Sequence, residues 1–298
     1  MLASVKTLLS ETIDYAGLFP PAKLSMREAL TNYACYQMAF THTMLGHFVL
    51  PASRLKELEE QLLTFCPEDD RTRHWQLSLI ASPELESARV QQMQIFNDRH
   101  KVSIAALEFP PLSPRKIEKI LPALPAGIEA FFEIPYTEDL KPYIIVLGDT
   151  GAGVAAKIRT GGANAEAFPT IAQLYQFIFA CAEAEIPFKA TAGLHHPLTG
   201  RYHLKSDTDS PNVFMHGFLN VAVAAALLYW HKVTAREALV VLQESSLDAF
   251  QFKAESILWK DRQINLKEIK ETRKSFFRSF GSCSFQEPIE SLKELKLL

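Results

Sequence analysis

Short apolar segments alternate with longer amphipathic segments along most of this 298-residue chain, and no other feature constrains the fold as strongly. The short segments have the length and composition of buried strands, whereas the longer ones have the period of helices. Strands that are separated by helices and buried on both faces pair in parallel, with right-handed crossovers. The candidate strands are 12–20, 43–51, 74–82, 102–110, 128–136, 153–161, 187–194 and, with the least distinct pattern, 212–219.

Eight such units in roughly 230 residues favour a closed (β/α)8 barrel of the TIM type. The runner-up is an open doubly wound sheet, but no GxGxxG follows the first strand to indicate a dinucleotide fold. Helices are expected between the strands, for example over 25–39, 53–65 and 82–98. The alternation ends near residue 232. We therefore expect a barrel over 1–232 and a helical C-terminal extension over 233–298 that packs on it.

Composition excludes several classes of protein. A formal net charge of −3 gives no electrostatic reason to expect nucleic acid or an anionic membrane as a partner. The N-terminus has no signal-peptide pattern, and the longest apolar run, 218–230, is shorter than the ~20 residues that span a bilayer. The cysteines lack CxxC or zinc-ligand spacing, which is typical of reduced thiols in a cytoplasmic protein. They are Cys35, Cys66, Cys181 and Cys283.

Two of the expected strands contain a lysine among small apolar residues, in GVAAKIRTGG (153–162) and PFKATAGLHHP (187–197). A buried ammonium group costs several kcal/mol unless it is paired or its pKa falls. Strand alternation places Lys157 and Arg159 on one face, and Lys189 shares a face with Thr191. Because the apolar alternates must face the helices, we expect these side chains to point into the barrel mouth, where barrel enzymes carry their chemistry.

Carboxylates lie at matching places on other strands. Glu108 and Glu133 stand near the ends of 102–110 and 128–136, and Asp14 lies early in the first strand. They could be acid–base groups, metal ligands, or the ion-pair partners that neutralise the lysines. The mouth is therefore expected to be a site of mixed charge.

The turn after the first lysine strand suggests a place for an anionic substrate group. Thr160 is followed by Gly161 and Gly162, and backbone amides at such a turn can bind phosphate or carboxylate, with Arg159 nearby. Two glycines also end strands for purely geometric reasons, so both explanations stay open.

The remaining candidates have competing explanations. His195 and His196 lie on the loop after the second lysine strand, where they could contact substrate or form an ordinary surface turn. His216 could be a ligand or a packed core residue, and the core explanation is favoured. Cys283, in FGSCSF, is typical of a turn thiol rather than a nucleophile. The sequence has no P-loop, haem or iron–sulfur pattern, so no cofactor is expected, with a divalent metal as the alternative.

KIRTGG and KATAGL, whose lysines lie 32 residues apart, resemble the two lysine strands of class I deoxyribose-phosphate aldolase, a (β/α)8 barrel enzyme. The resemblance implies that Lys157 forms a Schiff base with substrate and that Lys189 tunes its pKa. Arg159 stands where that family has a small hydroxyl residue. The segments DYAGLFPPA, KIRTGG, FKATAGLHHP and FGSCSFQEP together also resemble a family of bacterial proteins of unassigned function.

Three functions are consistent with these residues. The first is a lyase of the Schiff-base aldolase type that acts on a small oxo compound, with a phosphate or carboxylate group held by Arg159. The second is a barrel enzyme in which Glu108, Glu133 and a histidine hold a divalent metal. The third is a non-catalytic barrel that binds a metabolite. In each case we expect an anionic small-molecule ligand, and a homo-oligomer is possible.

Overall fold

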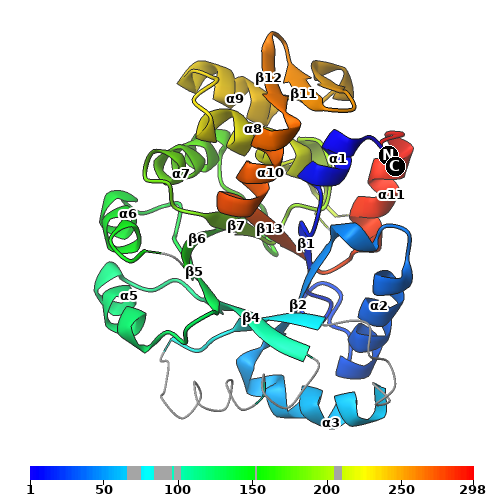
Figure 1. Cartoon of the computed structure of the whole chain (residues 1–298), viewed down its shortest axis with the longest axis vertical. Coiled ribbons are helices and arrows are strands. Elements are labelled where there is room, and N and C mark those ends of the chain that lie inside the picture. Colours follow the sequence, from blue (N-terminus) through cyan, green and yellow to red (C-terminus); the bar gives the residue numbers. More distant parts are fainter. Residues whose placement is uncertain (66–74, 84–95, 97–101, 152, 205–209) are drawn as a thin grey trace.

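The computed structural model describes residues 1–65, 75–83, 96, 102–151, 153–204 and 210–298. The expected helix over 82–98 lies almost wholly outside these residues. The described chain forms a closed barrel of parallel strands surrounded by helices (Figure 1). The barrel strands, in chain order, are β1 (Ile13–Tyr15), β2 (Leu45–Pro51), β3 (Trp75–Ile80), β4 (Val102–Phe109), β5 (Glu129–Glu133), β6 (Val154–Arg159), β7 (Phe188–Thr191) and β13 (Phe277–Ser282).

The (β/α)8 fold predicted from the sequence is confirmed. The strands pair around the barrel in the order β1-β13-β7-β6-β5-β4-β3-β2, so each strand has two parallel neighbours and none has an open edge. The described α-helices are α1 (Ala3–Leu8), α2 (Met26–Met38), α3 (Leu55–Phe65), α5 (Pro114–Ile120), α6 (Lys141–Gly148), α7 (Ile171–Glu183), α8 (Phe218–Tyr229), α9 (Ala235–Gln243), α10 (Leu266–Ser275) and α11 (Gln286–Glu294).

Local sequence signals explain where several helices begin. Ser25 caps α2 in a capping box with Glu28, and Thr170 caps α7 in the same way with Gln173. Pro114 occupies the first turn of α5, where the missing amide hydrogen costs nothing. These caps satisfy backbone groups at helix starts and fix the crossovers that carry the chain from one strand to the next.

The closing strand is not the one that the sequence predicts. Residues 212–215 form β9 (Asn212–Met215), which pairs with β8 (Gly200–His203) in an antiparallel hairpin outside the barrel. The barrel closes instead through β13, which pairs in parallel with β1 and β7. The segment 233–298 is therefore not a purely helical extension, and the barrel is not confined to 1–232.

An insertion explains why the closing strand comes so late. Between α9 and α10 the chain forms an antiparallel sheet of β10 (Phe250–Phe252), β11 (Ser256–Trp259) and β12 (Arg262–Asn265). The apolar run near residue 220 is α8, a helix buried along almost its whole length rather than a membrane span. Among the described residues, no helix is long and apolar enough to cross a membrane.

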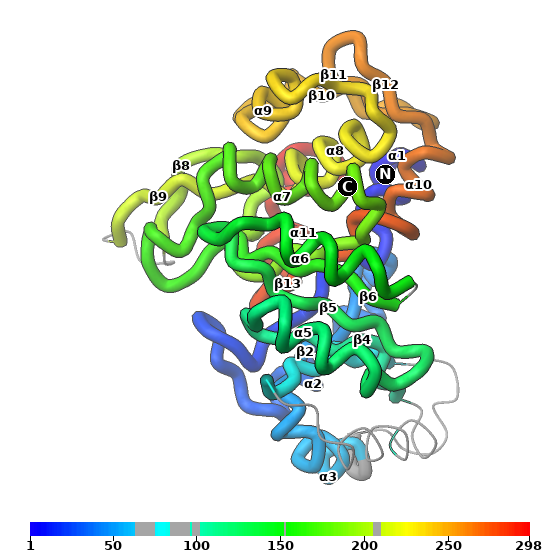
Figure 2. The backbone as a smooth tube through the Cα atoms, turned by 90° about the vertical axis from the view of Figure 1, so that its left-hand side faces the viewer, coloured from blue at the N-terminus to red at the C-terminus, as the bar shows by residue number. Residues whose placement is uncertain are grey.

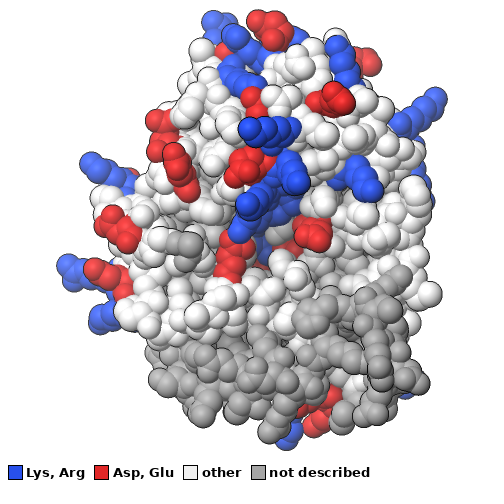
Figure 3. All heavy atoms as spheres, viewed as in Figure 1, with Lys and Arg blue, Asp and Glu red and all other residues white. Residues whose placement is uncertain are grey.

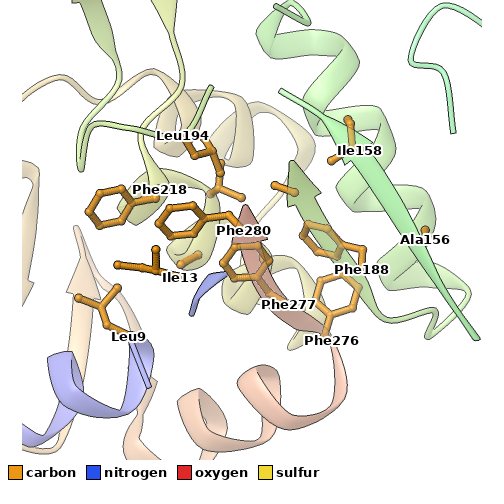
Figure 4. Close-up of a cluster of buried hydrophobic side chains, with 14 of the residues drawn as sticks. Leu9, Ile13, Ala156, Ile158, Phe188, Leu194, Phe218, Phe276, Phe277 and Phe280 are labelled. Carbon is orange, nitrogen blue, oxygen red and sulfur yellow. The ribbon is translucent and has the colours of Figure 1, made fainter. Parts of the chain in front are cut away.

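Aromatic packing fixes β13 in place. Phe188 on β7 lies against Phe276 and Phe277, with ring centroids 5.0 and 5.2 Å apart, and Phe280 stacks on Phe218 of α8 at 5.2 Å (Figure 4). These rings are buried in the layer between strands and helices. They leave the other face of β13 to line the barrel interior.

The two ends of the barrel are covered by different elements. α1 and α10 lie at the end where the strands begin, and the β8–β9 hairpin projects at the opposite end (Figure 2). We call these the N-terminal and C-terminal faces.

Candidate active site

Both lysines of the two lysine strands point into the barrel, as strand alternation predicts. Lys157 and Lys189 are adjacent partners in the β6–β7 register, and Lys157 is also the partner of Glu133 on β5. The lysine side chains are only 3% and 1% exposed. An ammonium group at that depth needs carboxylate partners, and the neighbouring strands provide them.

Lys189 is held between two carboxylates. Its Nζ lies 2.5 Å from Asp14 Oδ2 and 2.6 Å from Glu108 Oε1. Burial alone would lower the pKa of Lys189, but these two carboxylates outweigh burial and hold the pKa above its ordinary value. Lys189 is therefore a permanent cation at neutral pH.

Lys157 is held more loosely. Its Nζ lies 3.2 Å from Glu133 Oε2 and 3.4 Å from Glu108 Oε2. Both carboxylates also have a second cation, because Glu108 binds Lys189 and Glu133 accepts a 3.0 Å hydrogen bond from Arg159 Nε. Both carboxylates that contact Lys157 therefore have another cationic partner.

Two serines and a histidine complete the network. Ser78 donates to Glu108 Oε1 at 2.7 Å, and Ser279 donates to Asp14 Oδ2 at 2.6 Å. The backbone amide of His47 donates to Asp14 Oδ1 at 2.8 Å, and its ring Nδ1 lies 3.0 Å from the same oxygen. The sequence analysis missed all three. Each faces the interior from a strand, but a single small or aromatic polar residue in a strand carries no distinctive signal.

The pKa values of the two deepest carboxylates are low. Burial would raise the pKa of Asp14, but Lys189 and then His47 outweigh it and hold the pKa far below its usual range. Burial would likewise raise the pKa of Glu108, but Lys189 and Lys157 lower it to about 2. Both groups are carboxylates at neutral pH, so neither is the proton donor of a reaction there.

Arg159 ends the network at the C-terminal face. Its side chain is 48% exposed, whereas Glu133, its partner, is almost buried. We call the series Arg159, Glu133, Lys157, Glu108, Lys189 and Asp14 the charge chain, in which cations and carboxylates alternate. Three carboxylates meet three cations, so the chain is neutral when every group is ionised.

The glycine turn after β6 is packed tightly against the end of β7. The amide of Thr160 donates to Thr191 O at 2.9 Å, and Thr160 Oγ1 donates to Ala192 O. A Cβ on Gly161 would lie 2.6 Å from Gly193 Cα, so no side chain fits there. Close backbone approach thus accounts for Gly161 without a ligand. The expected anion pocket stays a prediction, and the more exposed Gly162 is its remaining backbone candidate.

The histidines of the C-terminal face have partners away from the lysines. His195 Nδ1 lies 3.1 Å from Glu287 Oε2 on α11, and the ring of His196 stacks on Tyr202 at 3.5 Å. His216 is buried, with Nε2 2.7 Å from Pro169 O. Within the described part of the chain, no ion pair or hydrogen bond joins these rings to the charge chain.

The surroundings of Cys283 and of the carboxylates considered as metal ligands bear on the two remaining alternatives. Burial raises the pKa of Cys283, which disfavours a reactive thiolate. Of the residues that the structure describes, no three His, Cys, Asp or Glu side chains lie together in a way that could hold a metal ion. The oxygens of Glu108 and Glu133 contact lysine and arginine nitrogens instead.

Comparisons of the chain with protein-family models, curated proteins and solved structures find no match.

Proposed function

We propose that the protein is an enzyme of the lyase class that uses Lys157 as an amine nucleophile toward a small oxo compound. The observation that supports this most directly is the loose contact of Lys157 with two carboxylates beside a lysine that is fixed as a cation. The reactive form of an amine nucleophile is the neutral one, and Glu133 beside Lys157 is a group that could take its proton. The position of Lys157 near the C-terminal end of β6 matches the place where barrel enzymes act.

Glu133 is the proton carrier in this proposal. It contacts Lys157 on one oxygen and Arg159 on the other, and it lies closer to the C-terminal face than Glu108. The ammonium of Lys157 gives a proton to Glu133, and the free amine adds to the substrate carbonyl carbon. The former carbonyl oxygen takes one proton from the added nitrogen and one back from Glu133, and it leaves as water, which gives an iminium ion. The net reaction converts an ammonium group and a carbonyl compound into an iminium ion and water.

Arg159 would bind an anionic group of the substrate. Its half-exposed guanidinium is the outermost cation of the charge chain, and guanidinium groups bind carboxylate or phosphate in a bidentate way. Glu108 would act as a positioning residue, because it holds both lysines and stays ionised.

Borohydride trapping tests the proposal. The protein is incubated with small aldehydes, keto acids and sugar phosphates, reduced, digested and analysed by mass spectrometry. We expect an adduct on Lys157 that disappears in Lys157→Ala, a variant that should fold because Glu108 and Glu133 keep other cations. Lys116→Ala, at an exposed position of α5, is the control for unspecific labelling.

Labelling confined to exposed lysines, with Lys157 unmodified by every compound, would overturn the amine mechanism. Activity that survives Lys157→Ala and requires added Mg²⁺, Mn²⁺ or Zn²⁺ would favour the metal-assisted alternative. Ligand binding without turnover, in the unmodified protein and in Lys157→Ala alike, would favour the non-catalytic barrel.

A further inference from the structure

A large cavity lies at the N-terminal face, the end opposite to the proposed active site. It has a volume of about 1230 Å³, and its walls come from α1, α10 and the residues that begin β2, β3, β5 and β13. That is large enough for a sugar phosphate or nucleotide, since small-molecule sites usually occupy about 300–1,000 Å³. His47 and Ser279 belong both to its wall and to the network around Asp14.

The charge of this cavity is predominantly positive. Five cations line it, against the two carboxylates of Glu11 and Glu129. Arg278 is paired with Glu129 at 2.8 Å, which leaves four cations without a carboxylate partner among the described residues. Figure 3 shows lysine and arginine side chains gathered near the middle of this face, where Figure 1 shows α10. The four cations are Lys6, Lys270, Arg273 and Lys274.

Helix periodicity accounts for the convergence of three of these cations. Lys270, Arg273 and Lys274 share one face of α10 with Leu266, since residues three and four apart lie above one another. Lys6 comes from α1, which is more than 250 residues away in the sequence and packs beside α10. Cations from two helices therefore line the same cavity.

Two buried polar atoms in the wall have no hydrogen-bond partner. Arg273 donates from its terminal nitrogens to the carbonyls of Ser10, Phe277 and Arg278, but its Nε has no acceptor. Thr43 Oγ1, also in the wall, lacks a partner too. An unsatisfied buried polar group costs about 1–3 kcal/mol, so it is rare and needs an explanation. The carbonyl bonds hold the Arg273 guanidinium in place in the wall of the cavity.

The ordinary explanation for basic residues here is the dipole of α10. Cations in the last turn of a helix interact favourably with its C-terminal end, and Arg273 and Lys274 lie in that turn. This accounts for their charge but not for Lys6 on α1 or for the two unsatisfied atoms. Burial, together with Arg278, lowers the pKa of Arg273, so its charge is incompletely balanced by the groups around it.

We propose that this cavity is a binding site for a phosphorylated small molecule. The phosphoryl group would contact Lys270 and Lys274, with the positive charge of Arg273 in the same wall. Several converging cations match a group with about two negative charges and three acceptor oxygens. The rest of the ligand would lie against Leu45 and Tyr33. The site is independent of the proposed reaction at Lys157.

Calorimetric titration with inorganic pyrophosphate and with ribose 5-phosphate tests the site. We expect both to bind the unmodified protein, and the double substitution Lys270→Ala/Lys274→Ala to weaken binding at least about tenfold, the effect of losing charged hydrogen bonds. Lys267→Ala is the matched control, because Lys267 is exposed on α10 but does not line the cavity. Both lysines of the double variant are exposed, so its thermal midpoint should be unchanged.

A second substitution, Lys6→Ala on α1, should also weaken binding, because Lys6 lines the same cavity and is exposed. Lys157→Ala should leave binding intact, so failure of the two proposals can be distinguished. The site is overturned if neither phosphate compound binds at millimolar concentration, or if Lys270→Ala/Lys274→Ala binds as tightly as Lys267→Ala. If citrate binds as tightly as the phosphate compounds, the ligand class is a polycarboxylate and not a phosphorylated molecule.

Discussion

In the charge chain, each carboxylate contacts at least two neighbouring side chains. These shared contacts determine how the stability of the protein responds to a substitution. Glu108 gives one oxygen to Lys189 and the other to Lys157, and Glu133 serves Lys157 and Arg159 in the same way. Asp14 depends on Lys189 for its close ion pair, and its other contacts are the hydroxyl of Ser279 and the amide and ring of His47. The two lysines are therefore unequal in what their loss leaves behind.

Lys189→Met should destabilise the protein far more than Lys157→Met. Removal of one partner from a buried ion pair costs about 3–5 kcal/mol, because the other charge stays buried. For Lys157→Met we expect roughly half of that loss, since both of its carboxylates keep a cation. Urea unfolding of the two variants measures the difference, and equal losses would contradict the unequal roles of the lysines.

The same carboxylates give stability a defined pH dependence. The pKa values of Asp14 and Glu108 are lowered in the folded protein, that of Glu108 to about 2. Their contribution is complete above the unfolded values of about 4 and is lost as the pH falls through the folded values. We expect the free energy of unfolding contributed by these groups to be constant from pH 7 to about 5 and to fall between about pH 4 and pH 2.

Urea titrations at fixed pH values measure this dependence. Glu28→Gln, which changes an exposed cap of α2, is the control, and it should leave the steep acid loss in place. A loss of stability that is already complete by pH 5 would show that the buried carboxylates bind protons far more readily than the ion pairs imply.

At the scale of elements, β6 and β7 meet so closely at their ends that only glycine fits between them. Gly193 has a φ of 79°, and a Cβ there would lie 2.5 Å from Thr160 O. The turn holds Arg159 and Thr191 in adjacent register, so backbone packing controls the geometry of the C-terminal face. The Gly-Gly signal in the sequence thus has a packing cause as well as a possible binding role.

Gly193→Ala should cost more stability than Gly151→Ala, which is a matched control. Gly151 has a similar φ of 74° but no atom within 4 Å of an added Cβ. The conformational cost of about 1 kcal/mol is common to both, and Gly193→Ala adds a steric clash. We expect a difference of at least about 2 kcal/mol in chemical unfolding. Similar losses of stability in the two variants would mean that the turns after β6 and β7 can move apart easily.

Sequence patterns correctly predicted seven of the eight barrel strands and the inward direction of the lysines, because period-two alternation is strong where one face of a strand must be apolar. They failed at β13 for a physical reason. Ser279 faces Asp14, and Gly281 lies beside Thr191, so its interior positions are small or polar. Its paired aromatic residues resemble the continuation of α10. The N-terminal cavity was equally hidden, since it joins helices from opposite ends of the chain.

At the scale of the whole molecule, both ends of the sequence are needed to close the barrel. β13 pairs with β1 on one side and with β7 on the other. Without β13, these two strands would expose unpaired backbone groups, which cost free energy and promote aggregation. The apparent boundary near residue 232 is therefore not a place where the chain can be divided.

A fragment of residues 1–232 should fail to fold as a monomeric barrel, because it lacks the closing strand. We expect it to aggregate or to unfold without a cooperative transition, as followed by circular dichroism and urea unfolding. The full chain, purified in parallel, serves as the reference. A soluble fragment with a sharp transition would show that the first seven strands form an independent unit.

The charge chain extends from Arg159, exposed at one face, to Asp14, whose other partner His47 lies in the cavity at the opposite face. Successive members of this series are in contact, so a change of charge at one member alters the electrostatic potential at the next. If a ligand of the proposed active site changes proton uptake by the charge chain, thermodynamic reciprocity requires that protonation change the affinity for that ligand by the same factor. A barrel filled with leucine and valine would contain no groups to link ligand binding to pH in this way.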